Sequence, residues 1–265
     1  MCEKLMILGA GVYQVPLIQT AKRMGLYVVV LSPGNYPGMA LADKVIDCDI
    51  RDEEGVYQAA RAEGVAGIIS DETDMPLLAM SYATQKLGLP GNPYECTKLF
   101  CDKYRMREKC RELGLPSIEY RLVSTLEEAK EFLRALGRPA IIKPVDSGGS
   151  KGVTRIDTEA DLEQHFEEAK GFSGNGDVII ERFIEGKELE VDAIALGGKA
   201  ETLMYADLES FDLPNVFAST TRLYPSVKDP AIVEKLLALD KAVVEGFGLQ
   251  QGLTHDEYIL DEEDG

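Results

Sequence analysis

Histidine and tryptophan are scarce in this chain of 265 residues, which contains two histidines and no tryptophan. A Ser–His–Asp hydrolase would have to use His165 or His255, and neither lies in a pattern that supports such a triad. The five cysteines are odd in number and form no C-x-x-C pair. We therefore expect reduced thiols in a cytoplasmic protein, without a structural zinc site.

Basic charge and long apolar runs are also lacking. Lysine and arginine number 28 against 46 acidic residues, which gives a net charge of −18. This charge argues against nucleic acid or an acidic membrane as a partner, but it permits a small anion in a local basic pocket. No apolar run approaches a membrane span, and Met1–Lys4 leads directly into a strand-like segment. We accordingly expect no signal peptide and no membrane association.

Strand and helix patterns alternate through the first part of the chain. Alternating βα units imply a parallel sheet that helices cover on both faces. A turn-rich break at Gly88–Glu95 indicates a domain boundary, so we expect one domain at 1–96 and a second at 97–265. The predicted strands of the first domain are 4–11, 26–34, 43–50 and 65–72, and its predicted helices are 13–25, 53–63 and 76–87.

The second part of the chain has a different order of elements. Asp102 can cap a helix that runs to about Leu113, and three successive strand patterns with short connections indicate antiparallel pairing. This is the pattern of an α+β domain. Its predicted strands are 118–123, 139–145, 153–156, 177–184, 187–196, 200–208, 217–225 and 252–260, with helices at 126–136, 159–170 and 231–245.

The segment "GAGVYQV" (Gly9–Val15) is similar to the dinucleotide fingerprint G-x-G-x-x-G. However, Gln14 stands in place of the third glycine, and the second strand ends at Ser32 rather than at an acid that could hold a ribose. A tight strand-to-helix turn without a cofactor is therefore the favoured interpretation. A Rossmann-type NAD-dependent oxidoreductase is the alternative.

A lysine and a glycine-rich loop follow one another in "IIKPVDSGGSKGV" (Ile141–Val153). Strand alternation places Lys143 on the same face as Ile141, so its amine is expected to point inward. A buried, unpaired ammonium costs several kcal/mol, and a phosphate would remove that cost. The glycines allow backbone N–H groups to approach an anion, although the loop is not a Walker A motif. The alternative is a surface hairpin with Lys143 reaching water.

A second lysine, Lys103, stands in the first turn of the helix that Asp102 caps. A cation there opposes the helix dipole at a cost of about 0.3–1 kcal/mol. Helical spacing also places it on the face of Met106 and Cys110, toward the core. Both preferences indicate a nearby anion, and a solvated lysine is the alternative.

Three carboxylates alternate with apolar residues in "KELEVDA": Glu188, Glu190 and Asp192. They therefore share one face of a strand. That face is either exposed to solvent or forms a site that attracts hydroxyl donors and cations.

The order of these segments resembles the ATP-grasp superfamily, and the resemblance covers nearly the whole chain. Within it, the sequence is similar to the carbamoyl-phosphate synthetase large subunit and to carboxylate–amine ligases. The motifs that carry the resemblance are "CDKYRMRE", "IIKPVDSGGSKGV", "VIIERFIEGKELEVD" and "GLTHDEYIL". It implies a Rossmann-like pre-ATP-grasp domain (1–96) and an ATP-grasp domain (97–265) with a lid subdomain at about 118–186.

The resemblance also implies roles for individual residues. Lys103 and Lys143 are expected to contact the phosphates of ATP, and Glu188 the ribose hydroxyls. Glu257 is expected to bind Mg²⁺, and Arg222 is a candidate contact for the substrate. The loop expected to close over the phosphates is Ser147, Gly148, Gly149, Ser150, Lys151 and Gly152, and the segment expected at the adenine edge, largely through its backbone, is Glu181, Arg182, Phe183 and Ile184.

The reaction that the resemblance implies is ATP-dependent phosphorylation of a carboxylate, followed by attack of an amine on the acyl phosphate. ATP and Mg²⁺ would be the cofactors, and small carboxylates and amines the partners; a homodimer is compatible with this expectation. In the family, a further strand carries a glutamate and an asparagine that hold the metals, whereas the sequence stops at Asp261–Gly265. We therefore expect a C-terminally incomplete, truncated domain that binds ATP without ligase activity. A non-catalytic nucleotide-binding protein is the alternative.

Overall fold

The computed structural model describes residues 2–211, 213 and 215–261, and it divides into two compact units, Met1–Cys101 and Asp102–Gly265. The division lies five residues beyond the predicted boundary at residue 96. The reason is an unpredicted helix, α4 (Tyr94–Cys101), which packs against α3 (Leu77–Leu87) of the first unit. No helix among the described residues has the length and hydrophobicity needed to cross a membrane.

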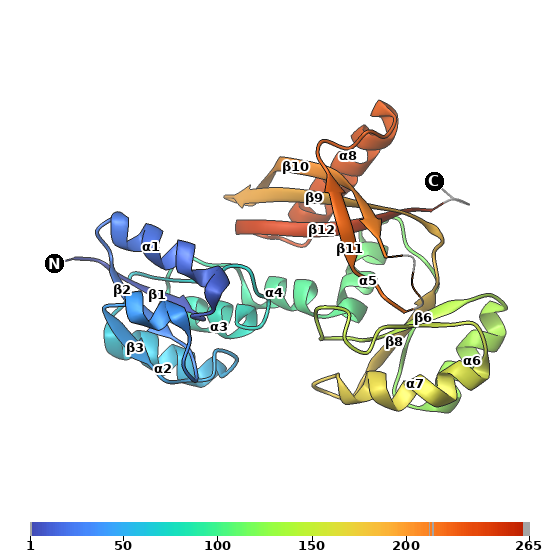
Figure 1. The fold of residues 1–265 in the computed structure, drawn as a ribbon, viewed down its shortest axis with the longest axis horizontal. Coiled ribbons are helices and arrows are strands. Elements are labelled where there is room, and N and C mark those ends of the chain that lie inside the picture. The colour runs from blue at the N-terminus through green and yellow to red at the C-terminus, as the bar shows by residue number, and fades with distance from the viewer. Residues whose placement is uncertain (1, 212, 214, 262–265) are drawn as a thin grey trace. The chain divides into compact units, whose positions relative to one another are not determined.

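The first unit is a parallel sheet with strand order β3-β2-β1-β4, as the alternating pattern predicted (Figure 1). Apolar residues of α1 pack on one face of the sheet and those of α2 and α3 on the other, so both faces are buried. The strands are β1 (Lys4–Leu8), β2 (Tyr27–Leu31), β3 (Lys44–Ile46) and β4 (Gly67–Ile69), and the helices are α1 (Val15–Arg23) and α2 (Glu53–Glu63), with 3₁₀ turns η1 (Val12–Gln14) and η2 (Pro37–Leu41).

The second unit opens with helix α5 (Lys103–Glu112) and contains two antiparallel sheets. In the first sheet the strand order is β5-β8-β6-β7, and helices α6 (Leu126–Leu136) and α7 (Glu159–Gly171) pack on it. Both helices begin with a capping box, in which a threonine and an acid three residues later exchange hydrogen bonds with the backbone. The strands are β5 (Tyr120–Val123), β6 (Ala140–Pro144), β7 (Thr154–Ile156) and β8 (Val178–Arg182).

The second sheet has strand order β11-β10-β9-β12, and the predicted antiparallel pairing of its three successive strands is confirmed. Helix α8 (Pro230–Gly246) covers one face through contacts with Leu189 and Val191. The parallel first unit and α+β second unit confirm the predicted fold class. The strands are β9 (Gly186–Leu196), β10 (Lys199–Ser210), β11 (Ser219–Leu223) and β12 (Gln251–Asp261).

The register between β9 and β12 brings polar side chains together on the sheet face opposite α8. Glu190 pairs with Glu257 and Asp192 with His255, while Leu189 of the same strand packs toward the helix. Alternation along each strand therefore separates an apolar face from a charged one.

Candidate functional site

Lys143 at the end of β6 forms an ion pair with a carboxylate that the sequence analysis did not assign to it. Its Nζ lies 2.7 Å from Glu181 Oε2, and Arg107 Nε of α5 lies 2.5 Å from Glu181 Oε1. The Glu181 side chain is 1% exposed. Burial opposes its ionisation, but the charges of Lys143 and Arg107 outweigh burial and lower the pKa of Glu181 to about 2.

Lys103, the second predicted phosphate contact, lies at the start of the glycine-rich loop. Its Nζ donates to the Ser147 carbonyl at 2.6 Å, and its backbone N–H donates to the Val145 carbonyl at 2.9 Å. Burial and the nearby charge of Lys143 lower the pKa of the Lys103 ammonium. The predicted cap is also present, since the Asp102 side chain accepts from Arg105 N. The two lysines thus share one electrostatic environment.

Three basic side chains gather around this point. Lys143 and Arg107 both pair with the carboxylate of Glu181, whereas Lys103 is affected by the charges of Lys143, Asp146, Glu181 and Asp102. In a chain with a net charge of −18, this is a local concentration of basic side chains at which an anion can bind.

The loop Ser147–Gly152 has the backbone conformation that only glycine-rich segments adopt easily. Gly149, Ser150 and Gly152 all have positive φ angles, of 66°, 55° and 68°. Gly152 has a steric reason as well, because a Cβ there would lie 3.0 Å from both Phe172 and Pro144. The Ser150 hydroxyl donates to the Phe217 carbonyl at 2.9 Å, and Lys151 is exposed.

The segment Glu181–Ile184, expected at the adenine edge, has two of its backbone N–H groups engaged. Arg182 N donates to the Glu119 carbonyl at 2.8 Å and Phe183 N to the Pro139 carbonyl at 3.0 Å. The Arg182 side chain forms a 2.8 Å ion pair with Asp261. We expected this segment to lie at the adenine edge, largely through its backbone. The buried side chain of Glu181 has a further role, because it forms an ion pair with Lys143.

The acidic stripe of β9 meets hydroxyl donors and cations, the second of the two interpretations of its alternating pattern. Ser210 Oγ donates to the Glu188 carboxylate. Tyr224 Oη donates to Glu190 Oε1 at 2.5 Å, a hydrogen bond that raises the pKa of Tyr224 to about 12. The stripe is thus a polar site rather than a plain solvent face.

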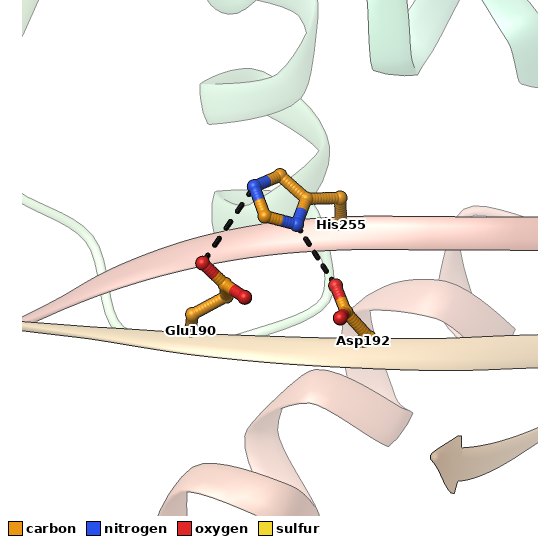
Figure 2. Close-up of side chains that lie close together, drawn as sticks. All are labelled: Glu190, Asp192 and His255. Carbon is orange, nitrogen blue, oxygen red and sulfur yellow. Dashed lines mark hydrogen bonds and ion pairs between the residues drawn. The ribbon is translucent and has the colours of Figure 1, made fainter. Parts of the chain in front are cut away.

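Figure 2 shows His255 between two carboxylates of this stripe. His255 Nδ1 lies 2.8 Å from Asp192 Oδ1, and His255 Nε2 lies 3.8 Å from Glu190 Oε2. Arg222, the candidate substrate contact, lies with its Nε 2.9 Å from the same Glu190 oxygen. Glu257, the predicted magnesium ligand, is 62% exposed and lies 3.9 Å from His255 Nε2.

Sequence reasoning missed four residues of these clusters, and two had a readable signal. Arg107 lies four residues after Lys103, hence on the same helix face, and His255 lies two residues before Glu257, hence on the same strand face. Tyr224 and Ser210 had no such signal, because only the fold brings them to Glu190 and Glu188.

The early glycine turn is filled by a protein side chain. Gln14 is buried, its amide donates to the Asp71 carbonyl at 2.8 Å, and its atoms lie 3.0–3.6 Å from where a Cβ of Gly9 or Gly11 would stand. This packing agrees with the interpretation as a tight turn without a cofactor.

Comparison with known proteins identifies one matching family and several similar proteins. Residues 110–211 match the family described as D-ala D-ala ligase C-terminus. An alanine–anticapsin ligase of Bacillus subtilis is 28% identical over 235 residues, which are 79% of this chain and 49% of that protein. A carbamoyl phosphate synthase large chain of Clostridium acetobutylicum is 25% identical over 210 residues, which are 78% of this chain and 19% of that one.

Solved structures show the same fold at low sequence identity. An L-amino acid ligase from Bacillus licheniformis has a TM-score of 0.80 and 22% identity, over 98% of this chain and 64% of that one. The biotin carboxylase domain of Hydrogenobacter thermophilus 2-oxoglutarate carboxylase, solved with MgADP, has a TM-score of 0.83 and 20% identity, over 100% and 62%.

The chain resembles the ATP-grasp superfamily and is similar to carboxylate–amine ligases and to carbamoyl phosphate synthase large chains. The resemblance inferred from the sequence motifs is therefore confirmed. The chain spans about half of the length of the alanine–anticapsin ligases it matches.

Proposed function

We propose that the second unit binds ATP, with Lys103 and Lys143 contacting its phosphates. The observation that carries this proposal is the convergence of the two lysines beside the loop Ser147–Gly152, where the charge of Lys143 acts on Lys103. A phosphate group would pair with both ammonium groups, and the loop can present backbone N–H groups to it. The segment at about 118–186 would act as the lid.

We propose the roles of the other residues from their positions in the sequence motifs. Glu188, which accepts a hydrogen bond from Ser210, would accept the ribose hydroxyls, and Glu181–Ile184 would border the adenine. Mg²⁺ takes oxygen ligands, commonly one or two carboxylates and the phosphates of the nucleotide. The exposed carboxylate of Glu257 fits that requirement, so we assign it to magnesium.

We propose that the whole protein joins a small carboxylate to an amine through an acyl phosphate. Bound ATP and Mg²⁺ would supply the phosphoryl group and neutralise its charge. This chain's lysines would orient the phosphates, and the loop would exclude water from them. Arg222, half-exposed beside Glu190, is the proposed contact for the substrate.

Lys143→Ala is expected to weaken ATP binding by about 1.5–3 kcal/mol, the value of a charge-assisted hydrogen bond. The variant should still fold, because Arg107 continues to pair with Glu181. Calorimetric titration with ATP and Mg²⁺ measures the effect, and Lys199→Ala, which removes an exposed lysine, is the matched control. An ATP affinity equal to that of the wild type would remove Lys143 from the phosphate site. The same titration with NAD tests the oxidoreductase alternative, for which we expect no binding.

We expect these 265 residues to bind ATP without turning it over. Among the described residues, Glu257 is the one magnesium ligand that the resemblance assigns, and a single carboxylate does not fix the metals that neutralise a moving phosphoryl group. The assay is ADP release with Mg²⁺ and a panel of amino-acid and other carboxylate substrates. Substrate-dependent ADP release would contradict this expectation and favour the enzyme over the non-catalytic nucleotide-binding protein.

A further inference from the structure

A pocket of about 420 Å³ is lined by residues of β10, of helix α8 and of the connection that joins β11 to α8. This volume is in the range of small-molecule sites. Tyr205 of β10 packs with Leu189 and Val191 toward α8, so the pocket lies on the face of the sheet that α8 covers (Figure 1). The acidic stripe of β9 lies on the opposite face. The pocket is therefore separate from the clusters described above.

The helix side of the pocket is largely apolar. Pro230, Val233 and Leu237 line it together with Glu234. Their spacing along the chain is that of one helix face, so all four side chains point toward the same side of α8. A ligand in the pocket would thus meet an apolar surface with one carboxylate in it.

Lys228 presents an ammonium group to which no described residue offers a hydrogen bond. Its Nζ lies 3.8 Å from Asp207 Oδ2, which is beyond hydrogen-bond distance. The buried Asp207 carboxylate instead accepts from Ser226 Oγ at 2.6 Å and from Val227 N at 3.2 Å. Ser226 Oγ in turn accepts from Lys228 N at 3.2 Å. These bonds hold the Lys228 backbone at the pocket, while its side chain remains 26% exposed.

Glu234 supplies the opposite charge from the helix. It is exposed and forms no ion pair with Lys228 or with any other residue that the structure describes. Lys228 and Glu234 therefore line one pocket without neutralising each other directly. A ligand that carries both a carboxylate and an ammonium group would pair with both of them.

The local charge disfavours polyanions such as phosphates. Asp207 and Glu234 carry two negative charges, and Lys228 carries one positive charge. A second or third negative charge on a ligand would be repelled, whereas a zwitterion brings no net charge. The apolar helix face favours a ligand that also has an apolar group to bury.

We propose that this pocket binds an α-amino acid with an apolar side chain, as a second small-molecule site on the protein. Lys228 pairs with the carboxylate of the ligand and Glu234 with its ammonium group, while Val233 and Leu237 contact its side chain. The site uses none of the residues assigned to ATP, to Mg²⁺ or to the ligase substrate. Its failure would therefore leave those proposals standing.

The test is a titration of the nucleotide-free protein with L-leucine, followed by NMR of isotope-labelled methyl groups. We expect saturable shifts of the Val233 and Leu237 methyls, with a Kd on the order of 1 mM for so small a ligand. The methyls of Leu253, on the opposite face of the sheet, should not shift. Glycine, which lacks the apolar group, should bind at least about 10-fold more weakly.

Two variants and two leucine analogues separate the two charges. Lys228→Met should weaken L-leucine binding about 10-fold, but it should not weaken isoamylamine, which has no carboxylate. Glu234→Gln should weaken L-leucine binding about 3-fold, because Glu234 is exposed, but it should not weaken isocaproate, which has no ammonium group. Lys241→Met, which removes an exposed lysine of α8 outside the pocket, is the matched control.

The substituted side chains are all at least partly exposed, and circular dichroism checks that each variant folds. Absence of saturable shifts at Val233 and Leu237, or equal L-leucine binding by the wild type and folded Lys228→Met, would overturn the proposal. Binding that is lost in Arg222→Met but kept in Lys228→Met would also overturn it, since it would assign L-leucine to the proposed contact for the ligase substrate.

Discussion

Glu181→Gln should lower the free energy of unfolding of the second unit by about 3 kcal/mol. Removing one partner of a buried ion pair costs about 3–5 kcal/mol, because the remaining charges stay desolvated. The side chains of Arg107 and Lys143 are 32% and 22% exposed, so some water reaches them and the lower end of that range applies. The measurement is urea unfolding followed by circular dichroism at pH 7.

The matched control for this variant is Glu159→Gln. Glu159 forms a two-bond pair with Arg134, but both side chains are exposed, so its loss should cost less than about 1 kcal/mol. Equal losses for the two variants would show that the Glu181 network adds no more than a surface pair.

The stabilisation that the Glu181 carboxylate contributes to the folded protein depends on pH in a definite direction. Its pKa is lowered from 4.5 to about 2 in the folded protein, so its stabilisation is present above pH 4.5 and is lost as the pH falls from 4.5 to 2. Glu181→Gln should therefore flatten the acid side of the stability curve.

Asp240→Asn should remove a loss of stability that the wild type undergoes between about pH 4 and 7. Asp240 of α8 is 1% exposed and accepts a 3.0 Å hydrogen bond from Tyr258. Burial first, and then the charge of Asp256, raise its pKa from 3.8 to about 7. The folded protein therefore holds a proton that the unfolded chain releases near pH 3.8, and stability falls as the pH rises toward 7.

The size of this loss of stability follows from the shift in the pKa of Asp240. One pKa unit corresponds to about 1.4 kcal/mol, so a shift of about three units gives an upper limit of about 4 kcal/mol. Thermal unfolding at pH 4, 5.5, 7 and 8 would compare the wild type with Asp240→Asn and with Asp157→Asn, an exposed control. A wild-type slope that persists in Asp240→Asn would assign the pH dependence to another group, such as Asp256.

Local patterns predicted the elements well where side-chain periodicity was regular. The alternation of Glu188, Glu190 and Asp192 correctly placed them on one face of β9, and the cap at Asp102 was confirmed. Helix α4 was missed because "GLPGNPYE" contains three turn-forming residue types, although proline is also common just before or within the first helical turn.

Partners far apart in sequence were not predictable from such patterns. Arg107 and Glu181 are 74 residues apart, and 63 residues separate Asp192 from His255. Each pair forms because strand order and helix packing bring two elements together. Neither the strand order nor the helix packing is encoded in the local spacing of residue types. The sequence therefore indicated that Lys143 needs an anion, but not that Glu181 supplies one.

The ion pair between Glu181 and Lys143 also bears on how fast and how tightly an anion can be captured. A free lysine side chain loses rotamer freedom worth about 1.5–2 kcal/mol when it is fixed. In this protein, Glu181 holds the Lys143 ammonium in place before any ligand arrives, so that entropy is lost on folding rather than on association. Lys103, held by the Ser147 carbonyl, is fixed in the same way. An incoming phosphate would meet two ammonium groups that are already held in place.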